Sequence, residues 1–216
     1  MSLTHTPFDL SLYLVTDARL CRDYGLERTV AEAVEGGVTL VQLRDKHASD
    51  AEMIRQAKQL KALLAGSGVP LIINDRLAVA LESGADGLHV GQSDTAVQAA
   101  REALGDSAIL GLSINTLAEL KAAPLAQLDY LGLGPVFATA SKRDHASPLG
   151  FDGLARLARA ASLPCVAIGG LDARHSAQVR QAGAQGLAVI SAICGQPSPR
   201  DAALAFVTAR KDALTP

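Results

Sequence analysis

The sequence is poor in the residues that mark the extreme classes of protein. It contains no tryptophan, only 3% aromatic residues and three cysteines, at positions 21, 165 and 194. The cysteines are odd in number and widely spaced, which indicates neither a disulfide framework nor a zinc site, so a reduced, cytoplasmic compartment is expected. Glycine and polar residues interrupt every apolar run before it could span a bilayer. The first 14 residues lack a basic n-region and a continuous apolar stretch, so no signal peptide is predicted.

The chain also lacks a strong charge of either sign. Its formal net charge is -2, which gives no reason to expect nucleic acid or an anionic membrane as a partner. Hydrophobic residues make up 49% of the chain and charged residues 19%, as in an ordinary globular protein. With 216 residues, the chain is long enough for one sizeable core.

Short apolar runs alternate with longer segments of helical period along the whole chain. The runs predicted to be strands are Leu10 to Val15, Leu40 to Leu43, Leu71 to Ile73, Gly87 to Val90, Ala108 to Leu112, Tyr130 to Leu133, Cys165 to Ile168 and Gly186 to Ile190. The segments predicted to be helices are Leu26 to Glu35, Ala51 to Ala65, Arg76 to Glu82, Ala96 to Leu104, Thr116 to Ala122, Leu154 to Ala161, Arg174 to Gln181 and Arg200 to Arg210. This alternation, without a linker, predicts a single α/β domain over residues 1–216, a (β/α)8 TIM barrel. An open doubly wound sheet is the structural alternative.

Polar and charged residues cluster directly after several of the predicted strands, at 42–46, 74–76, 92–94 and 139–142. The carboxyl ends of parallel strands lie on one face of a barrel, so these clusters are expected to share one rim. Two carboxylates, several cations and short polar groups would then meet at one site. Such a set is suited to a metal ion and a polyphosphate.

The cluster after the second strand combines two kinds of cation. Gln42, Arg44 and Lys46 alternate, so in an extended segment their side chains would lie on one side. Arginine offers a planar fork and lysine a point charge, and both are common ligands of a diphosphate. A solvated charged turn is the alternative interpretation.

Carboxylates follow the third and fourth strands. Asn74 and Asp75 come directly after Leu71 to Ile73, and Asp94 follows the fourth strand. Helix capping is the simpler use of each residue alone, with Ser93 or Asp94 capping the helix that follows. Together, Asp75 and Asp94 predict a magnesium site, because two carboxylates from adjacent strands can share a hard cation that also binds phosphate oxygens.

The loops after the sixth, seventh and eighth strands predict a second anion pocket. The segment 134–142 is long, rich in hydroxyl groups and ends in Lys142, which suits a flap that closes over an anion, although a plain surface loop is the competing explanation. Gly169 and Gly170 follow the seventh strand, and Ser191 follows the eighth. Backbone amides before helices at these two places are a common monophosphate site in barrels.

Several of these segments together resemble one enzyme family, that of thiamine phosphate synthase. The matching motifs are LYLVTD from Leu12, QLRDK from Gln42, IINDRLAVALESGADGLHVGQSD from Ile72, GLS from Gly111, GPVFATASK from Gly134, AIGG from Ala167 and VISAI from Val189. They occur in order over nearly the whole chain. Two departures are Asp45, where the family usually has Glu, and Ser141, where it commonly has Thr; both keep the chemical group.

The resemblance implies a transferase that joins 4-amino-5-hydroxymethyl-2-methylpyrimidine diphosphate to 4-methyl-5-(2-hydroxyethyl)thiazole phosphate and releases diphosphate. By position, the pyrimidine diphosphate would contact Gln42, Leu43, Arg44, Asp45, Lys46, Asn74, Ser113 and Lys142. The thiazole phosphate would contact Thr139, Ala140, Ser141, Gly170, Ile190 and Ser191. The resemblance further implies Mg²⁺ on Asp75 and Asp94, and catalytic roles for Arg44, Lys46, Ser113 and Lys142.

Other functions stay open at this point. A thiazole tautomerase on the same barrel would be an isomerase, and the retention of the predicted metal and diphosphate residues argues against it. A non-catalytic sensor of phosphorylated ligands would bind without turnover. His89 lies inside a predicted strand, where a hydrogen-bonded histidine is expected rather than a catalytic base. The expected partners are small molecules, with a homo-oligomer left open.

Overall fold

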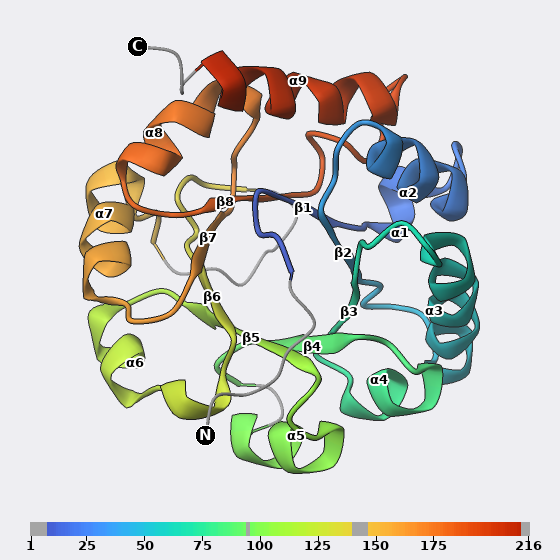
Figure 1. Ribbon diagram of the computed structural model, residues 1–216, viewed down its shortest axis with the longest axis horizontal. Helices are drawn as coiled ribbons and strands as arrows, with labels where there is room; N and C mark the ends of the chain where they lie inside the picture. Colours follow the sequence, from blue (N-terminus) through green and yellow to red (C-terminus); the bar gives the residue numbers. More distant parts are fainter. Residues whose placement is uncertain (1–7, 94–95, 140–146, 213–216) are drawn as a thin grey trace.

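The protein forms a closed barrel of eight parallel strands surrounded by helices (Figure 1). The structure is a computed structural model that describes residues 8–93, 96–139 and 147–212. Strand order around the barrel follows the sequence, and β1 pairs with β8, with Leu12 opposite Leu187, to close it. The predicted (β/α)8 fold is therefore confirmed, and the doubly wound alternative is wrong.

The strands lie close to the predicted runs because the runs are rich in Leu, Ile and Val. They are β1 (Leu12–Val15), β2 (Leu40–Leu43), β3 (Leu71–Asn74), β4 (Gly87–Val90), β5 (Ile109–Ile114), β6 (Tyr130–Leu133), β7 (Cys165–Ile168) and β8 (Gly186–Val189). Four of these have the predicted bounds. The fifth extends two residues further than predicted, which brings Ser113 inside the strand.

The helices cover the outside of the barrel (Figure 1). They are α1 (Ala18–Cys21), α2 (Leu26–Glu35), α3 (Asp50–Leu64), α4 (Leu77–Ser83), α5 (Val97–Leu104), α6 (Leu117–Ala122), α7 (Gly150–Ala160), α8 (Ser176–Gln181) and α9 (Pro199–Asp212). The sequence did not predict α1, a single turn that Asp17 caps by accepting a hydrogen bond from the Leu20 amide at 3.0 Å. Of the described residues, none lies in a helix long and apolar enough to cross a membrane.

Strand side chains alternate between two separate cores. The larger core lies between the strands and the helices and includes Leu14, Leu43, Leu88 and Leu133. The smaller core fills the barrel and consists mainly of one residue from most strands, including Tyr13, Leu40, Ile72 and Tyr130. Because successive strand residues point to opposite sides, inward residues lie two positions apart. Two positions after each inward apolar residue, nearer the carboxyl end of the strand, the next side chain therefore also points inward.

Candidate active site

Polar side chains occupy the inward positions nearest the carboxyl ends of the strands. Gln42 follows Leu40 on β2, Asn74 follows Ile72 on β3, and Ser113 stands above Ile109 on β5. His89 lies opposite Asn74 in the pairing of β3 with β4. Gln42 and Ser113 are only 4% and 8% exposed, so both side chains are buried at the carboxyl end of the barrel. The alternation of the strands thus brings together residues that the sequence predicted as one site.

An ion pair joins the loops that follow β2 and β3. Lys46 Nζ pairs with Asp75 Oδ2, and Asn74 Nδ2 donates to Asp75 Oδ1 at 2.9 Å. Asp75 has a φ of 62°, and it is the only non-glycine residue in the described ranges with positive φ. Such a backbone conformation is held by its surroundings and is common at functional sites. The helix that follows begins at Leu77 with Arg76 as its N-cap, so the capping interpretation of Asp75 is wrong.

Arg76 is a supporting residue that sequence analysis did not assign. Its guanidinium donates to the Ala48 carbonyl at 2.6 Å, to Asp50 Oδ1 at 2.9 Å and to the Asp45 carbonyl at 3.2 Å. It therefore fixes the loop after β2 from the loop after β3. The signal in the sequence was its position directly after Asn74 and Asp75.

The other residues of the loop after β2 have mixed orientations. The Arg44 amide donates to Thr16 Oγ1 at 3.0 Å, and Asp45 Oδ1 accepts the amides of His47 and Ala48. Arg44 and Asp45 line a cavity of about 180 Å³ between this loop and the first two helices. Leu43 packs in the outer core, so its side chain points away from the barrel interior.

The rim on the other side of the barrel is built from backbone. Gly169 and Gly170 have φ values of 91° and 67°, and a Cβ on Gly170 would lie 2.7 Å from the Phe137 Cβ. Only glycine fits there, because the chain runs against the loop after β6. In the described part of the chain, the N–H groups of Gly170 and Ser191 donate to no backbone carbonyl.

The amides after β8 do not belong to a helix. Residues 191–195 form a turn in which the Ile190 carbonyl accepts the amides of Ile193 and Cys194, and α9 begins only at Pro199. α9 begins close to the predicted Arg200, so no helix N-terminus lies at Ser191 itself. The polar donors there come from a turn, which can form an anion-binding concavity without a helix.

Part of the predicted site lies outside the described residues, namely Asp94, Ala140, Ser141 and Lys142. Thr139, the last residue described before this gap, is half-buried. Among residues 8–93, 96–139 and 147–212, no group of three or more His, Cys, Asp or Glu side chains could hold a metal ion. Ser93 makes no cap to α5, whose N-cap is Ala96.

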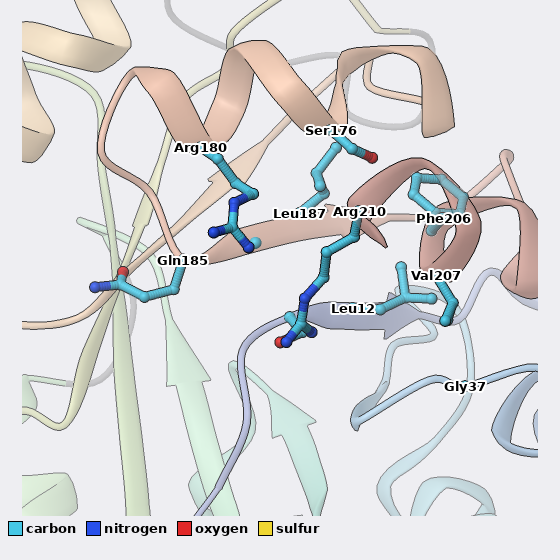
Figure 2. A pocket seen from close by; sticks show the side chains of 11 residues that line it. Leu12, Gly37, Ser176, Arg180, Gln185, Leu187, Phe206, Val207 and Arg210 are labelled. Atoms are coloured by element: carbon cyan, nitrogen blue, oxygen red, sulfur yellow. The ribbon is translucent and has the colours of Figure 1, made fainter. Parts of the chain in front are cut away.

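A second hollow lies at the opposite end of the barrel, where β1 and β8 begin (Figure 2). Arg180 and Arg210 extend towards it from α8 and α9, over a floor that includes Leu12 and Leu187. Its cavity of about 20 Å³ has room for about one water molecule. We therefore place the substrate site at the carboxyl ends of the strands.

The fold and the rim define a class of protein: a (β/α)8 barrel with a cation and a carboxylate at one side of its carboxyl end and a glycine-lined backbone pocket at the other. Residues 12–193 match the family model described as thiamine monophosphate synthase. The chain belongs to this family.

Individual relatives agree with the family. The thiamine-phosphate synthase of Psychrobacter sp. (strain PRwf-1) is 54% identical over 93% of this chain and 95% of the relative. That of Azorhizobium caulinodans is 51% identical over 94% of this chain and 95% of the relative. The solved thiamine phosphate pyrophosphorylase from Pyrococcus furiosus has a TM-score of 0.85 and 34% identity, covering 95% of this chain and 97% of that one. These names support the synthase and not the tautomerase alternative.

Proposed function

We propose that this chain is a thiamine-phosphate synthase that joins 4-amino-5-hydroxymethyl-2-methylpyrimidine diphosphate to 4-methyl-5-(2-hydroxyethyl)thiazole phosphate. The observation that carries this proposal is the two-sided rim. The Lys46–Asp75 pair lies on one side, after β2 and β3, and the glycine-lined backbone of Gly169 and Gly170 lies after β7. One substrate carries a diphosphate and the other a monophosphate, which matches a charged pocket and a backbone pocket.

The diphosphate pocket would use the side chains after β2 and β3. Arg44 and Lys46 would bind the diphosphate oxygens, with Asn74 and Asp45 beside them and Leu43 contributing through its backbone. Arg76 would keep these groups in place through its bonds to the Ala48 and Asp45 carbonyls. Gln42 and Ser113 would face the pyrimidine ring, because both point into the barrel.

The thiazole phosphate would bind on the other side of the rim. The Gly170 and Ser191 amides, with Ile190 beside them, would donate to the phosphate oxygens, since short backbone donors bind anions without a side-chain charge. By the family resemblance, Thr139, Ala140 and Ser141 would also face the thiazole phosphate. Lys142, on the same loop, would reach the diphosphate.

Bond formation needs no nucleophile from the protein. The carbon–oxygen bond to the diphosphate breaks, the diphosphate leaves with the electron pair, and the thiazole nitrogen attacks the methylene carbon. Arg44, Lys46 and Lys142 would stabilise the charge on the leaving group, and Ser113 would hold the ring in line. Catalysis would therefore come from positioning and electrostatic stabilisation.

Asp75 and Asp94 would hold Mg²⁺. The donor set consists of oxygen atoms and lacks sulfur and imidazole, which suits a hard cation. When bound, the ion supplies charge stabilisation to the diphosphate oxygens. The Lys46 ammonium contacts the Asp75 carboxylate where such a cation would bind, so we expect it to move to the substrate when the metal binds.

The experiment measures diphosphate release by the purified protein with the pyrimidine diphosphate, with and without the thiazole phosphate, and with Mg²⁺ or EDTA. The proposal expects release that depends on both substrates and on Mg²⁺. Isomerisation of the thiazole without diphosphate release would support the tautomerase instead. Binding of either substrate without turnover would support a sensor.

A further inference from the structure

A chain of buried hydrogen bonds crosses the inside of the barrel beneath the rim. Gln42 Nε2 donates to the Tyr13 hydroxyl at 2.6 Å, and the hydroxyls of Tyr13 and Tyr130 lie 2.9 Å apart. Tyr130 Oη lies 2.8 Å from His89 Nδ1, and His89 Nε2 lies 2.9 Å from Ser113 Oγ. The chain links side chains of β1, β2, β4, β5 and β6. Its two ends, Gln42 and Ser113, are the residues proposed to face the pyrimidine.

Glycines on two strands make room for the aromatic rings of this chain. A Cβ on Gly111 would lie 2.2 Å from the Tyr130 Cζ, and a Cβ on Gly132 would lie 3.2 Å from the His89 Cε1. Tyr130 therefore lies directly against the backbone of β5. Its ring centroid is 5.4 Å from that of His89 and 5.9 Å from that of Tyr13. Packing this close fixes the rings and hence the hydrogen bonds between them.

The hydrogen bonds of this network can all run in one direction, from Gln42 to Ser113. Burial raises the pKa of Tyr13 and of Tyr130, so each keeps its hydroxyl proton and can donate one hydrogen bond. The distance between the two hydroxyls allows either one to donate. Because Tyr13 accepts from the Gln42 amide, a single direction along the network would send the Tyr13 proton to Tyr130. Tyr130 would then donate to His89 Nδ1, and His89 would carry its proton on Nε2 and donate to Ser113 Oγ, because the roles of the two ring nitrogens depend on the tautomer.

With this direction, one hydrogen-bonding group at each end of the network can still bind a ligand. Ser113 Oγ accepts from His89, so its own proton is available to a ligand. Gln42 donates through Nε2, so its Oε1 is available as an acceptor. Neither Ser113 Oγ as a donor nor Gln42 Oε1 has a partner in the described part of the chain. An aminopyrimidine ring carries matching groups: its ring nitrogens can accept from Ser113, and its exocyclic amine can donate to Gln42 Oε1.

We infer that Tyr130 and His89 are positioning residues that determine specificity for an aminopyrimidine, by setting Ser113 as a donor and Gln42 as an acceptor. This inference rests on the proposed function for the identity of the ligand. It assigns neither residue a contact with the reacting atoms. An analogue with an oxo group in place of the amine presents an acceptor and a ring N–H, so it mismatches both ends.

The kinetic test uses Tyr130→Phe, with Tyr24→Phe as the matched control, because the Tyr24 hydroxyl bonds Glu32 outside the barrel at 2.7 Å. Tyr130→Phe is expected to raise the KM for the pyrimidine diphosphate at least about tenfold, since a broken polar network discriminates poorly. The KM for the thiazole phosphate should stay as in the wild type. The oxo analogue should inhibit Tyr130→Phe relatively better than it inhibits the wild type. Equal pyrimidine KM values in the two Phe variants would overturn the inference.

A second measurement needs neither substrate nor turnover. ¹⁵N NMR of histidine-labelled wild-type protein at neutral pH, with His89 assigned through His89→Gln, reports which ring nitrogen carries the proton. The inference expects the Nε2–H tautomer in the wild type and loss of that fixed tautomer in Tyr130→Phe. An Nδ1–H tautomer in the wild type would overturn it. Because this readout is independent of diphosphate release, failure of the inference and failure of the proposed function can be told apart.

Discussion

Replacing Asp75 by Asn separates the charge of this residue from its structural role. The φ of 62° places Asp75 in the left-handed region, which Asn tolerates as well as Asp does. The amide has the size and shape of the carboxylate, so the backbone should keep its conformation. Only the negative charge that faces Lys46 and the proposed metal is lost.

The expected effects on stability and on rate differ. The Lys46 side chain is 49% exposed, so solvent screens its ion pair with Asp75, and such pairs contribute about 0–1 kcal/mol. A loss of that size lowers Tm by about 4 °C at most for a domain of this length. Turnover should fall by about tenfold to a hundredfold, which corresponds to about 1.4–2.8 kcal/mol of transition-state stabilisation. Asp75→Ala should match this loss in rate and also lower Tm further, because the left-handed conformation costs alanine about 1–2 kcal/mol.

The assay is steady-state diphosphate release, measured beside thermal unfolding by circular dichroism. Asp86→Asn is the control, because Asp86 also pairs with a lysine, Lys61, at 2.6 Å, but precedes β4 at the opposite end of the barrel. The control should retain wild-type turnover. A wild-type rate in Asp75→Asn would refute the role of the charge, and a fall in Tm well beyond 4 °C would refute the separation of charge from structure.

Two further substitutions test other parts of the structure. Arg101→Met removes the cation that lies 2.7 Å from the buried carboxylate of Asp129. The free energy of unfolding, measured by denaturant titration, should therefore fall by about 3–5 kcal/mol. A loss below about 1 kcal/mol would contradict this expectation. Gly170→Ala places a Cβ 2.7 Å from the Phe137 Cβ, so the KM for the thiazole phosphate should rise at least about tenfold while that for the pyrimidine diphosphate stays the same. Gly66→Ala has the same left-handed strain with open space around it, so it should leave both KM values unchanged.

The sequence predicted the barrel well because its strands are short apolar runs that differ clearly from the helices. It did not predict α1, since four residues are too few to show a helical period. The turn after β8 was not predicted for a different reason. A Ser after a strand indicates a loop, but whether residues 191–195 form a turn depends on how this segment packs.

The site was predictable as a set of residues but not as a set of contacts. Lys46 and Asp75 could be assigned to one rim, whereas their pairing depends on the unusual backbone of Asp75. In the sequence, Arg76 is one charge in a polar cluster. Its hydrogen bond to the Ala48 carbonyl depends on how the loops after β2 and β3 pack together. Tyr13 and Tyr130 are far apart in sequence, so their hydrogen bond has no local signal.

Closure of the barrel by β1 and β8 has a consequence for how the chain acquires its fold. Leu12 and Leu187 pair across almost the full length of the sequence, so this contact has a very high contact order and can form only after β8 has left the ribosome. Until then, β1 and β7 each present an unpaired strand edge, which is prone to intermolecular pairing. We therefore expect chains truncated before Gly186 to aggregate, although they contain every residue proposed for the diphosphate pocket.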